Sequence, residues 1–185
     1  MSSKREAILR TALSLFATHG YHSVGVDRIK DEAGVSKMTL YKYFPTKEIL
    51  IEGVLRWRDE HFRESLEGAV AVASGCRGKI RAVFDWHDEW FRRDEFHGCM
   101  FIKASEEFPE NNSPIRLVAR QHKERIRQLL RLLLVEGGCK EAEPLSWYLL
   151  VMLEGVIVNA NMFSDRACVD ASWPYVDELL IRHLS

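Results

Sequence analysis

The sequence predicts an all-α protein of about nine helices. A small three-helix head, residues 1–47, is expected to precede a larger helical body, residues 48–185. Apolar residues recur every three or four positions, the period of a helix with one buried face. The alternation of β-branched and polar residues that marks strands is absent. Glycine and proline interrupt the pattern where helices would end.

The composition predicts a soluble globular protein. Of the 185 residues, 46% are hydrophobic, 29% charged and 10% aromatic, which allows a sizeable core and argues against disorder. The longest uninterrupted apolar run is 147–153, too short to span a membrane, and no signal peptide is expected at the N-terminus. The four cysteines form no CxxC pair, so a reduced, cytoplasmic setting is expected, with neither a zinc finger nor a disulfide framework.

The first four helices have clear start and stop signals. Gly20 ends the first helix as a C-cap, and Gly34 separates the second helix from the third. Ser36 is a good N-cap for the third helix, Pro45 ends it, and Thr46 caps a long fourth helix. The expected ranges are 4–19, 26–33, 37–44 and from 46 to about 73.

Five further helices are expected in the body. Residues 74–78, with two glycines, predict a break after the fourth helix. Ser113 followed by Pro114 predicts a helix start, and residues 137–138, both glycine, predict the end of that helix. The expected ranges are 79–93, 99–108, 114–136, 144–163 and 173–184.

The charge is unevenly distributed. Residues 1–47 contain eight Lys and Arg against four Asp and Glu, whereas residues 48–185 contain eighteen against twenty-three. A basic head on an acidic body points the head toward a polyanion.

Residues 26–44, VDRIKDEAGVSKMTLYKYF, place two short helices around the turn Gly34-Val35-Ser36. Gly34 can adopt the left-handed conformation at the corner, and Ser36 can satisfy free amides of the second helix. Ala33 is small enough to let the two helices approach closely. This is the helix-turn-helix signature, although an ordinary corner between two core helices would have the same spacing.

A helical projection of residues 37–44 defines an outer face. With Leu40 toward the core, Met38 and Lys42 fall near the opposite pole, and Thr39 and Tyr41 lie on the flanks at about 100°. Lysine can donate to guanine, and methionine or a threonine methyl can contact a thymine methyl. Hydroxyls and lysines can also hold phosphates. The mixture suits a recognition helix.

The longer string AGVSKMTLYKYFPTKEIL resembles the TetR family of transcriptional regulators, in which the pattern is roughly AGVS-x-x-TLY-x-YF-x-x-K-x-x-L. The matching residues are Ala33, Gly34, Val35, Ser36, Thr39, Leu40, Tyr41, Tyr43, Phe44, Lys47 and Leu50. Upstream, Phe16, Gly20, Tyr21, Val26 and Ile29 also fall at the family's spacing. The resemblance extends over residues 4–55 and implies DNA binding.

The resemblance implies roles for single residues of this segment. Thr39, Tyr41 and Lys47 would contact phosphates, while Lys37, Met38 and Tyr43 would face base edges. The sequence departs from the family at two places: Val24 and Gly25 replace the usual Thr or Ser before the second helix, and Met38 replaces a small residue or Pro. The missing hydroxyl contact would then be made by a backbone amide or be absent, and Met38 would alter base preference. With Lys42 from the projection, the candidate DNA-binding residues are Gly25, Ser36, Lys37, Met38, Thr39, Tyr41, Lys42, Tyr43 and Lys47.

The helix expected at 144–163 is apolar on nearly all sides, so it is either central in its own domain or shared with a partner. The resemblance implies that this helix and the last one pair with their copies in a homodimer. Two recognition helices about 34–36 Å apart would then bind a pseudo-palindromic DNA operator. Effector binding in the body would tilt the fourth helix and move the heads apart.

Aromatic residues are dense between residues 86 and 101. They resemble the family's pocket for a small-molecule effector, here apolar or aromatic, although an ordinary core would have the same pattern. The candidate effector-binding residues are Trp86, His87, Trp90, Phe101, Ser105, Gln121 and His122.

Cys99 offers an alternative form of regulation. It lies near a helix start and close to His97, Arg92 and Arg93, which could make the thiol a sensor of oxidants or electrophiles. A buried, inert thiol is the competing interpretation. Metal sensing by His87, His97 and Cys99 fits no common ligand spacing.

An enzyme is not expected. The sequence contains no GxSxG, HExxH or Rossmann fingerprint, and residues 75–79 lack the spacing and the Ser or Thr of a P-loop. No cofactor or metal is expected. A DNA-binding protein without an effector and an activator remain alternatives, but repression needs only promoter occupancy. The sequence does not identify the effector, the operator or the regulated genes.

Overall fold

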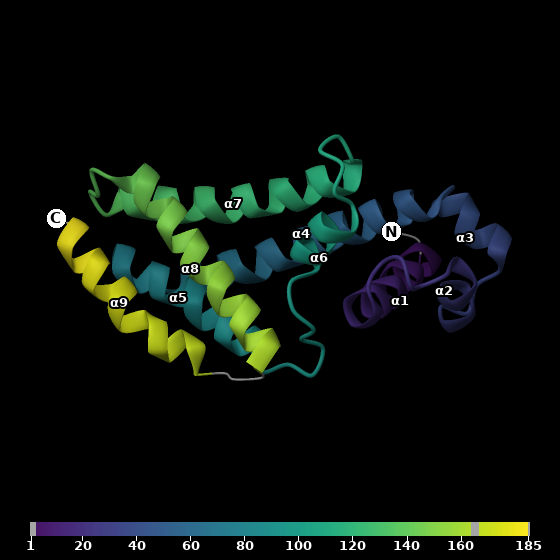
Figure 1. Ribbon diagram of the computed structural model, residues 1–185, viewed down its shortest axis with the longest axis horizontal. Coiled ribbons are helices and arrows are strands. Elements are labelled where there is room, and N and C mark those ends of the chain that lie inside the picture. The colour runs from purple at the N-terminus through teal and green to yellow at the C-terminus, as the bar shows by residue number, and fades with distance from the viewer. Residues whose placement is uncertain (1–2, 164–166, 185) are drawn as a thin grey trace. The chain divides into compact units, whose positions relative to one another are not determined.

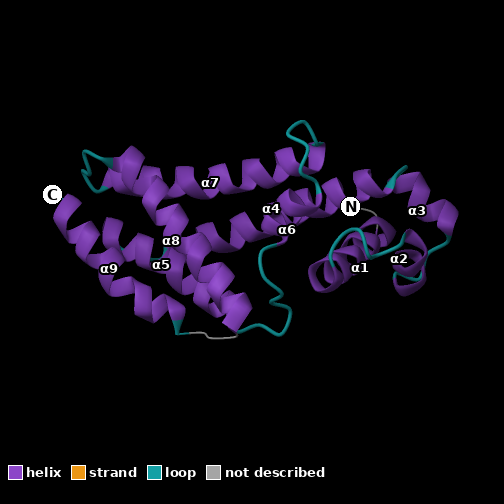
Figure 2. Cartoon of the chain, in the orientation of Figure 1, coloured by secondary structure: helices purple, strands orange, loops and turns teal. Residues whose placement is uncertain are grey.

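The computed structural model describes residues 3–163 and 167–184, and all regular secondary structure in these residues is helical (Figures 1 and 2). This confirms the predicted all-α class. The described residues form nine helices: α1 (Ser3–His19), α2 (Val26–Glu32), α3 (Lys37–Tyr43), α4 (Lys47–Ala71), α5 (Gly75–Phe91), α6 (Met100–Glu107), α7 (Pro114–Glu136), α8 (Ala142–Phe163) and α9 (Cys168–His183).

Three helices begin earlier than the glycine and proline signals predict. The smallest shift is in α8, which begins at Ala142 rather than at Pro144. The predicted break at 74–78 is wrong, because α5 begins at Gly75 and includes Gly78 in its first turn. The predicted start at Trp173 is also wrong: α9 begins at Cys168, and Pro174 lies inside it. Val169, Val176 and Leu180 are buried on α9, so side-chain packing outweighs the backbone hydrogen bond that Pro174 cannot donate.

The chain divides into two compact units, and these do not follow the predicted boundary at residue 47. Unit 1 comprises the chain up to residue 62 together with residues 99–122, and unit 2 comprises residues 63–98 and the chain from residue 123 onward. The helix-turn-helix segment therefore shares a unit with α6 and the first part of α7. Residues 1–47 as a separate DNA-binding domain stay a prediction.

In unit 1, α1 packs against α2 and α3. Helix α1 buries an apolar stripe that includes Ile8, Ala12 and Phe16. Ile29 of α2 and Leu40 of α3 are also buried. Because helices of seven residues are not stable alone in water, this packing stabilises the helix-turn-helix more than intrinsic propensity does.

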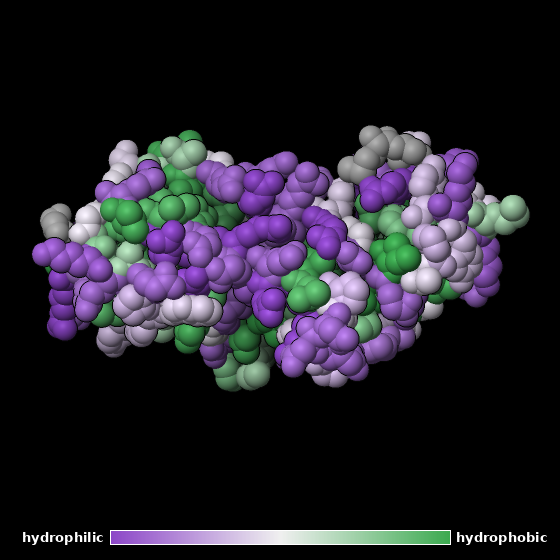
Figure 3. All heavy atoms as spheres, turned by 90° about the horizontal axis from the view of Figure 1, so that it is seen from above, coloured by the Kyte–Doolittle hydropathy of each residue, from purple (hydrophilic) through white to green (hydrophobic). Residues whose placement is uncertain are grey.

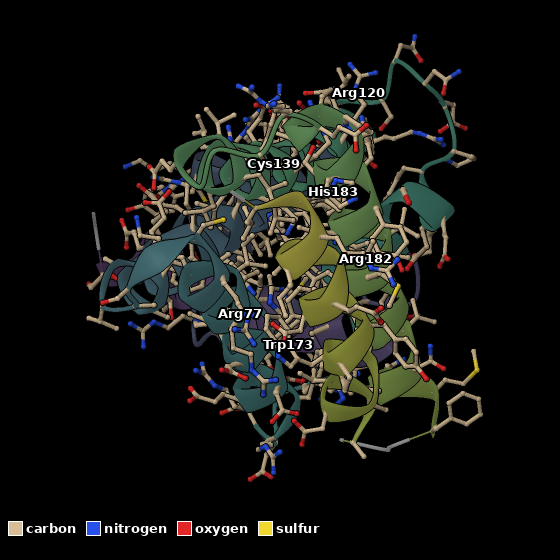
Figure 4. All side chains as sticks on the ribbon, turned by 90° about the vertical axis from the view of Figure 1, so that its left-hand side faces the viewer. Arg77, Arg120, Cys139, Trp173, Arg182 and His183 are labelled. Atoms are coloured by element: carbon tan, nitrogen blue, oxygen red, sulfur yellow. The ribbon has the colours of Figure 1, made fainter. Side chains whose placement is uncertain are left out.

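In unit 2, α5 packs against α8 and α9, and α8 packs against α9 (Figure 1). The Trp173 ring of α9 meets Phe84 of α5 edge to face at 5.7 Å, and the Arg81 guanidinium lies 4.8 Å above the Trp173 ring. Beside Trp173, Arg77 of α5 pairs with Asp177 of α9, with Nη2 and Oδ2 2.6 Å apart (Figure 4). Aromatic and charged contacts together fix α9 on α5.

Helix α8 meets the length and composition of a membrane span, although no uninterrupted apolar run in the sequence does. Over the 18-residue window that meets this criterion the mean hydropathy is 1.3, and 44% of the window is buried inside the protein. A core helix of a soluble protein has the same properties.

Candidate nucleic-acid interface

The turn between α2 and α3 has the geometry that its residues predict. Gly34 has φ of +64°, in the left-handed region. The Ser36 hydroxyl accepts a hydrogen bond from the Thr39 amide at 3.2 Å and lies 2.9 Å from the Thr39 hydroxyl. The predicted N-cap is confirmed, and it fixes the start of α3 relative to α2.

Helix α3 has one buried side and one exposed side, as the projection predicts. Leu40 is 1% exposed and Phe44, directly after the helix, is 2% exposed. Met38 is 86% exposed, and Tyr41 and Lys42 are also on the surface. A flexible apolar group, a phenol and a cation therefore point into solvent from a single helical turn, the set expected of a recognition helix.

Lys47 occupies the first position of α4, where backbone amides have no helical partners. Thr46 caps this end, since its hydroxyl accepts from the Ile49 amide at 3.2 Å. The Lys47 ammonium donates to the His22 carbonyl at 3.2 Å. Partial burial lowers the pKa of Lys47, although Glu48 and Glu107 oppose that shift. The ammonium retains further donors for a phosphate beside the helix end.

Two other predicted residues have local partners. Lys37 is exposed and its ammonium lies 3.3 Å from the Asp27 carboxylate, so its charge is partly compensated within the unit. Gly25 is the N-cap of α2 in an extended conformation and has no side-chain cap. Val24 beside it is buried in the core. Met38, Tyr41 and Lys42 are exposed as Lys37 is, but the Lys37 ammonium has an acidic partner.

Part of the predicted effector set lies in a buried polar-aromatic cluster of unit 1. The His122 ring stacks on Phe101 with centroids 3.6 Å apart, and Phe62 meets His122 edge to face at 5.0 Å. His122 Nδ1 lies 2.8 Å from Asp59 Oδ1, and the Asp59 residue is 6% exposed. Sequence reasoning missed Asp59 and Phe62, because their positions on α4 do not indicate which residues of other helices they contact.

The other two predicted residues of unit 1 are less suited to an effector. The Ser105 hydroxyl donates to the Ile102 carbonyl of its own helix at 2.8 Å, and Gln121 is exposed. The remaining candidates form a second cluster within unit 2. There, Trp86 donates through Nε1 to the Ser65 hydroxyl at 3.0 Å, and the His87 ring centroid lies 5.1 Å from that of Trp86 and 6.1 Å from that of Trp90.

Helix α8 exposes an apolar stripe. Trp147, Val151, Val158 and Met162 lie within about 60° of one another around the helix and are all exposed. Gly155 lies on the same face, and a Cβ there would meet nothing within 4 Å. In Figure 3, hydrophobic side chains also gather over part of unit 2, whereas other parts of the face are hydrophilic. An exposed apolar stripe on a helix marks an interaction surface.

Cys99 does not have the exposure expected of a sensor. It is the N-cap residue of α6, as its position predicts, but it is only 7% exposed. Burial hinders reaction with an oxidant in solution, so the cysteine-sensing alternative has no support. Within residues 3–163 and 167–184, no group of three His, Cys, Asp or Glu side chains is placed to hold a metal.

Comparison with known proteins connects this geometry to transcription regulation. Residues 8–54 match the family model described as bacterial regulatory proteins, tetR family. The chain is 37% identical over 93 residues to the HTH-type transcriptional regulator RutR of Escherichia coli K12, covering 46% of this chain and 44% of RutR. It is 31% identical over 91 residues to the HTH-type transcriptional activator FasR of Mycolicibacterium smegmatis, covering 49% and 42%. These matches span less than half the length of either relative.

A solved structure matches along the whole chain. The TetR-family transcriptional regulator SCO4454 from Streptomyces coelicolor superposes with a TM-score of 0.91 at 29% identity, covering 100% of this chain and 97% of SCO4454. The similarity to RutR and FasR is thus partial, whereas the fold of SCO4454 is shared from end to end.

Proposed function

This chain belongs to the TetR family of helix-turn-helix transcriptional regulators, and from that premise we propose that it is a dimeric repressor in the cytoplasm. Each protomer inserts α3 into the major groove of a pseudo-palindromic operator. Promoter occupancy then blocks transcription, and a small-molecule effector changes the affinity for the operator.

The observation that carries the proposal is the exposed side of α3. Met38, Tyr41 and Lys42 project from a helix whose opposite side is fixed by buried Leu40. Lys42 suits a guanine edge and Met38 a thymine methyl, while Tyr41 and Lys47 suit phosphates on either side. Thr39, Tyr43 and Lys37 complete the proposed contact surface, and Ser36 and Gly25 lie at the helix starts.

The apolar stripe of α8 supports a homodimer. One short recognition helix makes few contacts, but two such helices about one turn of DNA apart bind two half-sites at once. Trp147, Val151, Val158 and Met162 form a continuous face that a second copy of α8 can cover. Tyr175 and Ile181 of α9 are also exposed and extend the apolar surface available to a partner.

The proposed effector is an apolar or aromatic molecule, because the candidate residues in each unit are mainly aromatic. Phe101 and His122 form the stacked pair of unit 1, and Trp86 and Trp90 belong to the cluster of unit 2. Helix α4 begins at the DNA anchor Lys47 and continues to Ala71, so it provides a covalent route from effector to head. The effector must bind the low-affinity form more tightly, since otherwise it shifts no equilibrium.

The DNA contact can be tested with a duplex that the wild-type protein selects from a pool with a randomised centre. Lys47→Ala should raise the Kd about tenfold for every selected sequence and reduce the salt slope of a dimer by about 2. Lys140→Ala is the matched control, since Lys140 is exposed in unit 2. Equal affinities and slopes for the two variants would contradict the proposed docking.

The effector and the sign of regulation need separate measurements. Titration of the protein–duplex complex with a panel of apolar and aromatic molecules should identify compounds that change the Kd. If no member of a broad panel changes it, effector control is contradicted. Because FasR is an activator, transcription from the cognate promoter in vitro should be measured with and without the protein. The proposal requires a decrease.

A further inference from the structure

Helix α6 is hydrogen-bonded to the end of α1 and the loop that follows it at three points, all within unit 1. Tyr21 donates through its hydroxyl to the Met100 carbonyl at 2.8 Å. The Lys103 ammonium donates to the Ala17 carbonyl at 2.8 Å. The third point is Glu107, the last residue of α6. Positions 100, 103 and 107 share one side of a helix, so one side of α6 faces residues 17–22.

The Glu107 carboxylate accepts hydrogen bonds from two consecutive backbone amides. The Tyr21 amide lies 2.9 Å from Oε1 and 3.0 Å from Oε2, and the His22 amide lies 2.7 Å from Oε2. These amides follow the end of α1, where the helix ladder no longer provides an acceptor for them. A carboxylate is a strong acceptor for such donors because the hydrogen bonds are charge-assisted.

Gly20 makes this approach possible. Its φ is +81°, and a Cβ at this position would lie 2.8 Å from Glu107 Oε1. Any side chain would therefore displace the carboxylate as well as strain the backbone. The requirement for glycine at residue 20 thus reflects Glu107 in addition to the helix end.

The His22 backbone also contacts Lys47, the proposed DNA anchor. The His22 carbonyl accepts from the Lys47 ammonium at 3.2 Å, and His22 Nε2 lies 2.9 Å from the Glu107 carbonyl. The Phe108 ring packs 4.9 Å from the His22 ring. The amide and ring of His22 are thus held by residues 107–108, and its carbonyl in turn holds Lys47.

From this chain of contacts we infer that Glu107 is a positioning residue for DNA binding: it fixes the His22 backbone, which sets the place of the Lys47 ammonium at the start of α4. The inference rests on the proposed function, since it assigns Glu107 a role in the affinity for an operator. Glu107 itself does not touch DNA. Its negative charge near a phosphate-binding lysine would repel DNA, so any gain in affinity must come from geometry.

The test uses Glu107→Asp, which keeps the charge but shortens the side chain by one methylene. Glu106→Asp is the matched control, because Glu106 is the exposed neighbour on the same helix. With the selected duplex, Glu107→Asp should raise the Kd about tenfold, and Glu106→Asp should leave it within about twofold. An unchanged Kd for Glu107→Asp would overturn the inference.

A double-mutant cycle separates positioning from general stability. In a Lys47→Ala background, Glu107→Asp should change the Kd by less than about twofold, because the group that Glu107 positions is gone. A merely structural role would instead lower affinity by the same factor in both backgrounds, and that result would overturn the inference. Thermal unfolding of each variant shows whether the fold survives.

Amide exchange provides a readout without DNA. The Tyr21 and His22 amides should exchange at least about tenfold faster in Glu107→Asp than in wild type, while amides inside α5 should not change. Unchanged exchange at residues 21 and 22 would overturn the carboxylate contact itself. If the wild-type protein selects no duplex, the proposed function fails, and the positioning role fails with it even where exchange confirms the contact.

Discussion

Helices α3 and α8 both leave one face uncovered, but the two faces differ in chemistry. The outer face of α3 combines Met38 with Tyr41 and Lys42 on a helix of seven residues. The outer face of α8, a helix of 22 residues, is apolar from Trp147 to Met162. The buried sides of the two helices are both apolar, and their role is in the fold alone. The exposed chemistry distinguishes the partners that we propose, a polyanion for α3 and another apolar surface for α8.

The two faces also differ in the free-energy cost of leaving them exposed to water. Burial of apolar surface stabilises an assembly by about 25 cal/mol per square ångström, so covering the α8 stripe with a second copy is favourable. The α3 face has little to gain from apolar burial and can remain hydrated until DNA is present. We therefore expect dimerisation to be permanent and DNA binding to be reversible and salt-dependent.

The strongest test of this contrast is a charge in the α8 stripe. Val151→Asp should dissociate the dimer, because two carboxylates would be buried without partners, and should weaken operator binding by at least about 100-fold. Sedimentation equilibrium and fluorescence anisotropy measure the two effects. Val72→Asp makes the same change at a valine that is 86% exposed outside the stripe and should leave both unchanged. A dimer that survives Val151→Asp would assign the stripe to another partner.

The next largest effect is expected on the flank of α3. Tyr41→Ala should raise the Kd about tenfold for all duplexes alike, because a phosphate contact carries no sequence information. Tyr41→Phe separates the hydroxyl from the ring and should reproduce most of the loss. If Tyr41→Ala changes the ranking of duplexes instead, Tyr41 contacts bases and the assignment of the flank is wrong.

A smaller effect is expected at the outer pole of α3. Met38→Ala should change the preference between duplexes by about fivefold, since it removes one apolar contact to a base edge. The melting temperature should stay the same, because an 86%-exposed side chain has little packing to lose. Binding to a set of single-base variants measures the preference. A uniform loss across the set would place Met38 against the backbone.

The smallest effect is expected beside the α8 stripe, where the Arg127 guanidinium lies 4.6 Å from the centre of the Trp147 ring. Arg127, first, and then Gln128 lower the pKa of Glu124 from its usual value to about 2. The unfolded chain therefore binds a proton before the folded one as the pH falls. The stabilisation is present above about pH 4.5 and is lost between pH 4.5 and about pH 2.

Glu124→Gln should accordingly lower the free energy of unfolding at pH 7 by only about 0.5 kcal/mol, because the Glu124 side chain is 44% exposed and water screens the pair. Denaturant titrations at pH 7 and near pH 2 measure the difference, which should vanish at the lower pH. A difference that persists there would show that Glu124 acts through packing rather than charge.

The head was the more predictable part of the molecule. Gly34, Ser36 and Leu40 act over a few residues, so local rules were enough to orient α3 and to place Met38 outside. Glu107 was not predictable, because it meets Tyr21 from 86 positions away and no local pattern marks such a pair. The pairing of Asp59 with His122, 63 positions apart, was missed for the same reason.

The errors in unit 2 have a related cause. Gly78 and Pro174 are local helix breakers, and sequence reasoning gave their intrinsic cost full weight. Packing of α5 against α8 and α9 outweighs that cost, but the packing depends on which helices meet. The effector-binding residues stay a prediction, since aromatic side chains in a core and in a pocket have the same spacing.

The exposure of Met38 also has an evolutionary consequence. The Met38 side chain contributes nothing to the core, so substitutions at position 38 should not impair folding. After a gene duplication, one copy could acquire a new set of target promoters through this position while its core stayed intact. Buried Leu40, two residues away, cannot be replaced without loss of packing. A single seven-residue helix therefore contains both a position that is free to change and one that is not.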